Sequence, residues 1–333
     1  MPRAIKALFL LIFCILGLDS SCYGSKQNQL HKKKEFIRIG TASISGVYYT
    51  TGNAICRFLE KKSYTDQATN IKCSVQSTPG AMYNLNALKN NDLEIAIAQS
   101  DWEYHVFNST GIFKDKEPMK DLRSIFTTHK EAFTVMVKTS SGINSFDDIK
   151  GKIVNIGAPG TGVRGTIEDI MRAKNWKIED FKLATELSSS EQAQALCDGK
   201  IDVMINVIGH PNGIFQEASA TCDTKFISLD EVTLKTILGS HDYYSYYEIP
   251  AEHYMVENYV IPTIAVRSTF YAKEELPEEQ VYQVVESLFN NFSQFKSVHP
   301  AFYGLTKTGL IPKGSDVPIH SGALLYYKKI GLM

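Results

Sequence analysis

The sequence alternates short apolar runs with helical patterns in two successive series, and this alternation restricts the possible folds more than any other feature. In the first series, apolar runs at residues 36–39, 71–76 and 94–98 each lead through a turn rich in Gly, Ser and Thr into a stretch with helical periodicity. The second series begins with the run at residues 152–157 and continues in the same way. Strands that alternate with helices form mainly parallel sheets covered on both faces, so we predict an α/β fold.

Two longer extended segments, residues 124–138 and 258–268, separate parts of these series. A chain of 333 residues has room for two domains of ordinary size. We therefore predict a two-lobed clamshell in which each lobe is a mixed, mainly parallel sheet flanked by helices, and the two extended segments are hinge strands. Lobe 1 is expected at residues 36–130 and again, with the C-terminal helices, at residues 256–333. Lobe 2 is expected at residues 131–255.

The N-terminal segment has the features of a signal peptide. Two basic residues precede an apolar run at residues 7–18, which is too short to cross a bilayer core of about 30 Å as a helix. Small residues follow, so we predict that residues 1–24 are cleaved and that residues 25–35 form a linker. A lipoprotein would carry its lipid on Cys22, but Asp19 stands where such a signal needs an aliphatic residue. The mature protein is therefore expected in the periplasm.

Four of the six cysteines remain after that cleavage, and an even number outside the cytoplasm favours disulfides over a metal site. Four cysteines allow three pairings, of which the local one closes the shortest loops. That pairing joins Cys56 to Cys73 and Cys197 to Cys222. The sequence has no Cys-x-x-Cys motif, so it offers neither a thioredoxin-like motif nor a zinc-binding cysteine pair. We predict two structural disulfides and no metal.

Four turns share one chemistry, because each follows an apolar strand and precedes a helix. They are GTASISG (residues 40–46), QSTPGA (76–81), AQSDW (98–102) and GAPGTG (157–162). In open α/β sheets, ligands bind beyond the carboxyl ends of the strands, where helix N-termini offer unpaired N–H groups and a partial positive charge. Asp101 is suited to an ammonium group, and Arg164 lies just beyond the last turn. The turns therefore predict a site for a carboxylate or an amino acid, although Ser, Thr and Gly in such places also cap helices without binding anything.

Charge and motifs argue against several other functions. With 35 basic and 36 acidic residues the formal net charge is −1, whereas duplex nucleic acid needs a concentrated basic surface. GTGVRG (residues 160–165) fits the dinucleotide pattern G-x-G-x-x-G, but that match is weak by itself, and no clear ribose-binding acid ends the next strand. The sequence has no G-x-S-x-G, H-E-x-x-H or P-loop motif, so we predict no catalytic residue and no cofactor.

Long stretches of the sequence resemble the TAXI class of solute receptors for TRAP transporters. They are GVYYTTGNAICRFLEKK (46–62), IKCSVQSTPGAMYNLNAL (71–88), LEIAIAQSDWEYHVF (93–107), IGAPGTGVRGT (156–166), ALCDGKIDVMINVIGHPN (195–212), FNNFSQFKSVHPAF (289–302) and HSGALLYYKKIGL (320–332). The resemblance covers nearly all of the chain after residue 35. It implies a type II periplasmic-binding-protein fold whose lobes close on the ligand, and delivery of that ligand to a sodium-coupled membrane permease.

The resemblance also implies a ligand and the residues that contact it. TAXI receptors favour glutamate or related carboxylates, so a glutamate-like solute is the first expectation. Carried over position by position, the contacts in lobe 1 are Thr41, Ser43, Tyr49, Ser77, Asn84, Gln99, Ser100 and Asp101, and those in lobe 2 are Pro159, Gly160, Thr161, Gly162 and Arg164. The two disulfides proposed above also match the cysteine positions of the class. We expect a monomer whose partners are a small anionic or zwitterionic solute and a TRAP permease.

Two other classes of function stay open. One is an exported enzyme on the same fold, for which His210, before Pro211 at a strand end, is the candidate base. The other is a surface antigen or sensor that binds a solute without transporting it.

Overall fold

The computed structural model describes residues 35–44, 46–65, 71–256 and 259–333. The predicted signal peptide, residues 1–24, lies outside these residues, as does the predicted linker apart from Glu35. The strands are β1 (Glu35–Gly40), β2 (Ile71–Gln76), β3 (Ile95–Gln99), β4 (Leu122–Lys138), β5 (Ile153–Asn155), β6 (Leu183–Thr185), β7 (Val203–Ile208), β8 (Thr224–Phe226), β9 (Ser245–Ile249) and β10 (Ile261–Lys273). The α-helices are α1 (Val47–Thr65), α2 (Ala81–Lys89), α3 (Ser100–Asn108), α4 (Gly162–Ala173), α5 (Ser189–Cys197), α6 (Gly213–Thr221), α7 (Glu231–Ser240), α8 (Glu278–Asn290), α9 (Phe292–Lys296) and α10 (Ser321–Lys329). Among the described residues, no helix combines the length and the apolar character that crossing a bilayer requires.

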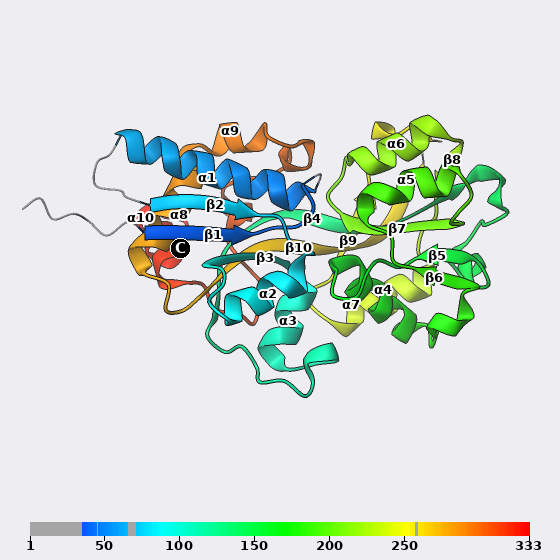
Figure 1. Ribbon diagram of the computed structural model, residues 1–333, viewed down its shortest axis with the longest axis horizontal. Coiled ribbons are helices and arrows are strands. Elements are labelled where there is room, and N and C mark those ends of the chain that lie inside the picture. Colours follow the sequence, from blue (N-terminus) through cyan, green and yellow to red (C-terminus); the bar gives the residue numbers. More distant parts are fainter. Residues whose placement is uncertain (1–34, 45, 66–70, 257–258) are drawn as a thin grey trace, which may run out of the picture. The chain divides into compact units, whose positions relative to one another are not determined.

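The strands form one mixed sheet with the order β2-β1-β3-β10-β4-β7-β5-β6, to which β8 adds beside β4 and β9 beside β10 (Figure 1). At one end β2, β1 and β3 are parallel, and at the other end β7, β5 and β6 are parallel. In the centre, β10 runs antiparallel to β3, β4 runs antiparallel to β7, and the two central strands run antiparallel to each other. The prediction of two α/β lobes with mixed, mainly parallel sheets is therefore confirmed.

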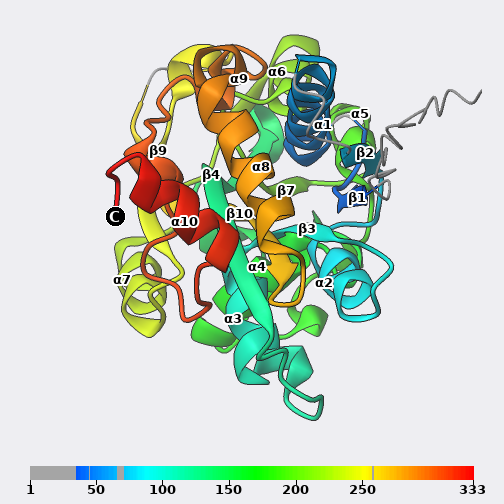
Figure 2. The same ribbon diagram turned by 90° about the vertical axis from the view of Figure 1, so that its left-hand side faces the viewer.

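Lobe 1 contains β1 to β3 and α1 to α3, together with the C-terminal helices. Helices α1, α8 and α10 cover one face of its strands, and α2 and α3 cover the other. Figure 2 shows α8 and α10 side by side across this lobe. Because both faces are covered, β3 is buried along its whole length, which explains its continuously apolar sequence IAIA.

Lobe 2 contains β5 to β9 and α4 to α7. Side chains from α4 and α7 pack on one face of its strands, and those from α5 and α6 pack on the other. The strand β7 lies between β4 and β5, and five of its six residues are buried. The two lobes thus have separate hydrophobic cores, as two domains of this size need.

Both long central strands belong to both lobes. The first half of β4 pairs with β10 in lobe 1, and its second half pairs with β7 and β8 in lobe 2. The strand β10 pairs with β9 at its start and with β3 at its end. The extended segment predicted at residues 124–138 is one strand of 17 residues, although its middle is polar. The predicted lobe boundary after residue 130 falls inside this strand.

The pairing of β4 with β10 is irregular at the point where the strands pass from one lobe to the other. Lys130 is opposite Arg267, but Thr127 is opposite Thr269, so the register shifts by one residue between these pairs. Such a bulge interrupts the ladder of hydrogen bonds and bends the strand locally.

Two elements differ from the predicted order. The tyrosine-rich stretch at residues 241–250, which no predicted strand covers, contains the strand β9, whose SYYEI alternates partly buried and exposed residues up to the buried Ile249. The segment after Pro211 forms the helix α6, which was not predicted. Asn212 starts this helix by accepting a hydrogen bond from the N–H of Ile214 at 3.0 Å.

Both predicted disulfides are present. Cys56 of α1 is bonded to Cys73 of β2, and Cys197 at the end of α5 is bonded to Cys222 just after α6. The sequence separations are 17 and 25 residues. Each bond therefore ties neighbouring elements within one lobe.

Candidate functional site

A cavity of about 350 Å³ is lined by residues of both lobes. Ser43, Tyr48 and Gln99 contribute to its wall from lobe 1, and Thr161 and Asn206 contribute from lobe 2. Apolar side chains share the wall with these polar groups. A small solute with both polar and apolar parts therefore suits this cavity.

Five helices begin at this cavity. Its lining includes the first residues of α1, α2, α4 and α5, which are Val47, Ala81, Gly162 and Ser189, and the second residue of α6, Ile214. Each of these helices follows a parallel strand, β1 or β2 in lobe 1 and β5, β6 or β7 in lobe 2. The cavity therefore lies at the carboxyl ends of both parallel strand groups, where open α/β sheets bind their ligands.

Side-chain caps hold three of these helix starts in place. The Thr161 hydroxyl accepts a hydrogen bond from the N–H of Arg164, Ser188 forms a capping box with Glu191, and Asn212 caps α6. A helix start has four N–H groups without partners inside the helix, and a cap uses only part of them. The cavity wall therefore carries N–H donors and a partial positive charge contributed by both lobes.

Four of the thirteen predicted contact residues line the cavity: Ser43, Gln99, Thr161 and Gly162. All four predicted turns reach the cavity, although the turn before α3 contributes only Gln99. The turns before α5 and α6 also reach it, although sequence reasoning did not single them out.

Three predicted residues lie outside the cavity lining and hydrogen-bond the turns of lobe 1 to one another. The Asn84 amide donates to the carbonyl oxygens of Thr41 at 2.6 Å and of Ile97 at 2.9 Å. The hydroxyl of Thr41 donates to the Gln76 carbonyl, and that of Ser77 donates to the Ala42 carbonyl. These bonds fix the ends of β1 and β2, so the three residues position the wall whether or not they touch a solute.

The side chains of Ser100 and Asp101 are engaged where α3 meets lobe 2. Ser100 donates to the Tyr243 carbonyl at 3.0 Å, and Asp101 accepts from the Thr166 hydroxyl at 3.0 Å. Burial and the nearby charge of Asp169 raise the pKa of Asp101 to about 7. Asp101 therefore joins the lobes outside the cavity lining.

Arg164 and Tyr49 also lie outside the lining. The Arg164 guanidinium contacts Glu168 at 2.5 Å and Glu186 at 3.2 Å, so its charge is matched by carboxylates of lobe 2. The neighbouring residue Tyr48 lines the cavity in place of Tyr49. These residues stay predicted contacts that the lining does not include.

Pro159 and Gly160 lie outside the lining too, and Gly160 belongs to a contact between the lobes. A methyl group added at Gly160 would meet Met82 of α2, and one added at Gly165 would meet the Trp102 ring of α3. At Gly162 it would overlap the Gln99 amide. The glycines of the G-x-G-x-x-G match thus admit lobe 1 side chains to the start of α4. Close packing between lobes accounts for this motif without a dinucleotide.

The hinge strand β4 contributes two residues to the cavity that sequence reasoning did not identify, His129 and Glu131. The Glu131 carboxyl accepts a hydrogen bond from the Gln99 amide at 2.5 Å and interacts with the Tyr48 hydroxyl. Burial raises the pKa of Glu131 to about 8, and burial lowers the pKa of His129 to about 3. Both side chains are therefore largely neutral at pH 7. The polar triplet His129-Lys130-Glu131 inside an apolar strand is the sequence signal that marked this place.

His210, the candidate base of an enzyme, is buried outside this cavity's lining. One ring nitrogen contacts the Thr134 hydroxyl at 2.7 Å, and the other contacts the Tyr254 hydroxyl. Burial lowers its pKa to about 3. With both nitrogens engaged, this histidine acts as a packed structural residue. Within the described ranges, no group of three His, Cys, Asp or Glu side chains is arranged to hold a metal ion.

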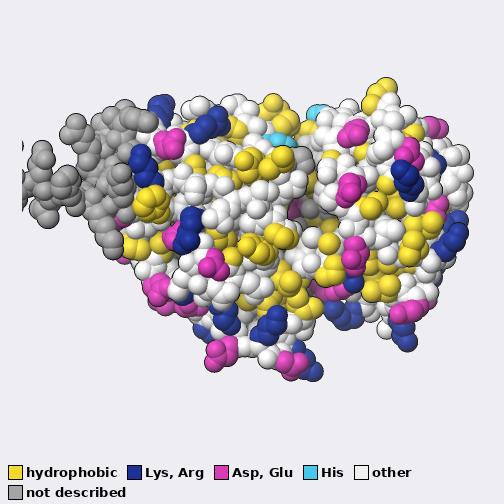
Figure 3. Space-filling model, viewed as in Figure 1, with side chains coloured by type: hydrophobic (Ala, Val, Ile, Leu, Met, Phe, Trp, Pro, Cys, Tyr) yellow, Lys and Arg dark blue, Asp and Glu magenta, His cyan; other side chains and the backbone are white. Residues whose placement is uncertain are grey.

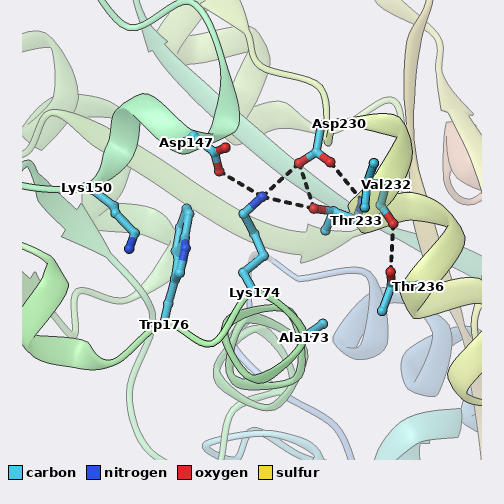
Figure 4. A pocket seen from close by; sticks show the side chains of 9 residues that line it. All are labelled: Asp147, Lys150, Ala173, Lys174, Trp176, Asp230, Val232, Thr233 and Thr236. Atoms are coloured by element: carbon cyan, nitrogen blue, oxygen red, sulfur yellow. Dashed lines mark hydrogen bonds and ion pairs between the residues drawn. The ribbon is translucent and has the colours of Figure 1, made fainter.

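A second cavity, of about 470 Å³, lies within lobe 2 (Figure 4). At its centre Lys174 contacts Asp147 at 2.7 Å and Asp230 at 2.9 Å, and it also donates to the Thr233 hydroxyl. The Lys174 ammonium lies 5.2 Å from the centre of the Trp176 ring. Its charge is thus fully matched within lobe 2, and the network fastens α4 to the start of α7.

The fold is that of the type II periplasmic-binding-protein class, with two α/β lobes joined by two long strands and a cavity at their shared edge. A solved structure of PhnD1 from Prochlorococcus marinus in complex with methylphosphonate is 10% identical, with a TM-score of 0.55 over 90% of this chain and 100% of that one. A chloride-bound protein from Xanthomonas citri is 9% identical, with a TM-score of 0.51 over 84% of this chain and 91% of that one. The periplasmic aliphatic sulphonate binding protein SsuA from Escherichia coli is 16% identical, with a TM-score of 0.49 over 82% of this chain and 76% of that one.

The sequence model of the NMT1-like family matches residues 39–331. The chain therefore belongs to the NMT1-like family. This match covers both lobes and the two strands that join them.

Proposed function

We propose that this protein is an extracytoplasmic solute-binding protein that captures a small carboxylate or amino acid between its lobes and delivers it to a membrane permease. A glutamate-like solute is the first candidate, and a TRAP-type permease is the proposed partner because of the resemblance to TAXI receptors. The protein is proposed to act in the periplasm after removal of residues 1–24, and to transform nothing.

The observation that carries this proposal is the meeting of five helix starts from two lobes at one cavity. An anion placed there gains N–H donors from lobe 1 and from lobe 2 at the same time. A solute that contacts both lobes binds the closed arrangement better than an open one, so it shifts the population towards closure. A permease that binds only the closed form would thereby distinguish the solute-bound protein from the solute-free protein. The methylphosphonate bound to PhnD1 is an anion in a protein of similar fold, which supports the same reading here.

Titration calorimetry with the chain from residue 25 tests the proposal. The panel contains L-glutamate, L-glutamine, L-leucine, glutarate, succinate and methylphosphonate. We expect saturable binding of at least one member at a stoichiometry of one. The variant Thr236→Ala, in the separate cavity of lobe 2, is expected to bind that solute as the unmodified chain does. Absence of binding across the whole panel contradicts the proposal.

A further inference from the structure

Four buried polar side chains that line the interlobe cavity have an atom without a hydrogen-bond partner among the described residues. The atoms are Gln99 Oε1, His129 Nε2, Glu131 Oε1 and Gln192 Oε1. Each of these side chains belongs to a residue that is less than 5% exposed. Buried polar atoms in folded proteins are almost always paired, because an unpaired one loses its bonds to water without replacement. Because they gather around one cavity, a solute bound there would gain hydrogen bonds from all four.

Two of these atoms, the amide oxygens of Gln99 and Gln192, can only accept hydrogen bonds, and Glu131 Oε1 becomes a third such acceptor when its carboxyl group loses its proton. The described part of the lining contains no Lys or Arg, so the chain supplies no cation to them. His129 Nε2 lies 3.6 Å from Glu131 Oε1, which is too long for a hydrogen bond. A positively charged group with several hydrogen-bond donors would therefore pair these side-chain oxygens.

Glu103 shows what a purely structural buried carboxyl looks like in this protein. It is as buried as Glu131, and its pKa is also raised by burial. Both of its oxygens are paired, however, one with the Tyr271 hydroxyl and the other with the Ser315 hydroxyl. Glu131 keeps one oxygen unpaired at the cavity wall, and this difference distinguishes a binding group from a packing group.

We propose that Glu131, with the side-chain oxygens of Gln99 and Gln192, is the subsite for the ammonium group of an amino-acid solute whose carboxylate lies at the helix starts. This inference rests on the proposed function and narrows it, since it selects amino acids over acids that lack an amino group. Glu131 lies on the hinge strand, Gln99 ends β3 in lobe 1, and Gln192 lies in α5 of lobe 2. A solute that pairs all three oxygens would thus contact both lobes and the strand between them.

The subsite also predicts release of a proton on binding. Tyr48 of α1, Asp101 of α3 and His129 of β4 itself are the titratable groups that face Glu131, and Ser268 of β10 is hydrogen-bonded to it. None of them is a cation at pH 7, so Glu131 holds its proton in the empty cavity. When an ammonium group arrives, the carboxyl O–H proton leaves for the buffer and the carboxylate faces the new charge.

The test compares each amino acid with the acid that lacks only its amino group, namely L-glutamate with glutarate and L-leucine with 4-methylpentanoate. Affinities are measured by calorimetry at pH 7 in phosphate and in Tris, whose different heats of ionisation report the proton released. For the unmodified chain we expect one amino acid to bind about 10- to 100-fold more tightly than its partner acid, as for hydrogen bonds to charged groups. We also expect release of up to about one proton per amino acid bound.

The variants are Glu131→Gln and, as the matched control, Glu103→Gln. Glu131→Gln should abolish both the preference for the amino acid and the proton release. It should still bind the partner acid with unchanged affinity, which shows that the variant is folded. Glu103→Gln should keep the preference and the proton release. Binding of both members of a pair with equal affinity, or an unchanged preference in Glu131→Gln, overturns this inference but leaves the proposed function standing. Absence of binding by all four solutes counts against the proposed function and overturns this inference with it.

Discussion

At the scale of single residues, burial of the Glu131 carboxyl group at the cavity wall lowers the free energy of unfolding at neutral pH. Its pKa of about 8 lies well above the ordinary value of 4.5 because the folded chain removes it from water. The folded state therefore keeps a proton that the unfolded chain gives up above about pH 4.5. The contribution of this group to stability is most favourable below pH 4.5, and it is lost as the pH rises towards 8.

The variant Glu131→Gln removes this titration and keeps the shape of the side chain. We expect its melting temperature to exceed that of the unmodified chain by roughly 5 °C at pH 8, with a smaller difference at pH 5. Scanning calorimetry of the solute-free protein at both pH values measures it. The exposed Glu117→Gln should change neither value. A difference of the same size at both pH values would show that the raised pKa is not its cause.

At the residue scale, four of the thirteen predicted contacts line the cavity, and the predictable ones lie where the chemistry follows a local sequence pattern. Ser43, Thr161 and Gly162 lie in turns whose strand-to-helix position is visible in the sequence, and they line the cavity. Tyr48 was missed by one position, since successive residues of a helix point about 100° apart and only the structure shows which one faces inward. Glu131 was missed because it approaches the turns only when β4 pairs with β10, a contact between segments more than a hundred residues apart.

At the scale of elements, the start of α4 packs against lobe 1 through its glycines. Gly162→Ala should force the Gln99 amide and the α4 start apart, because the added methyl group overlaps that amide. We expect solute affinity to fall about 5- to 100-fold, as for overpacking that costs about 1 to 3 kcal/mol, with the melting temperature little changed.

Calorimetric titration of this variant beside Gly239→Ala provides the check. Gly239 lies in α7, where an added methyl group meets nothing within 4 Å. That control should therefore bind normally. Unchanged affinity in Gly162→Ala would show that closure does not need this contact.

The disulfide Cys197–Cys222 ties α5 to the end of α6, and both helices begin at the cavity. Replacing both cysteines with serine should lower the free energy of unfolding by about 3 kcal/mol, because the unfolded chain regains the freedom of a 25-residue loop. Urea unfolding, with the Cys56–Cys73 bond left intact, measures this loss. An equal loss when the unmodified chain is measured after full reduction of both bonds would mean that Cys56–Cys73 adds nothing.

Element order followed from hydrophobic periodicity, since the β-α alternation of both lobes is present where it was predicted. The exceptions have local causes. The helix α6 begins at Gly213, shortly after Gly209 and Pro211, and these three residues favour turns. Its stability comes from packing Phe215 and Ala218 into lobe 2. The strand β9 has a short tyrosine-rich sequence that gives a weak strand signal, and it forms because β10 offers a free edge to pair with.

At the scale of the whole molecule, the face drawn in Figure 3 carries both signs of charge without a dominant patch. On the face in Figure 3, basic and acidic side chains are interspersed over both lobes. This distribution agrees with the net charge of −1 and gives no concentrated basic surface for nucleic acid on that face. We propose that recognition is concentrated in the cavity between the lobes.

A solute held by both lobes should stabilise the whole described fold and not one lobe alone. At a concentration 100 times its dissociation constant, it should add about 2.7 kcal/mol to the free energy of unfolding. Scanning calorimetry should show a single transition that moves to higher temperature with the logarithm of solute concentration. If two transitions are resolved and only one of them moves, the solute contacts a single lobe.

The register shift between β4 and β10 has one more consequence. It lies between Thr127 and Lys130, so a rotation of one lobe against the other at this point would break few backbone hydrogen bonds. Glu131 is the next residue along the strand. A solute that contacts Glu131 would therefore act close to this bend in β4. A small local shift there would produce a large displacement at the far ends of the two lobes.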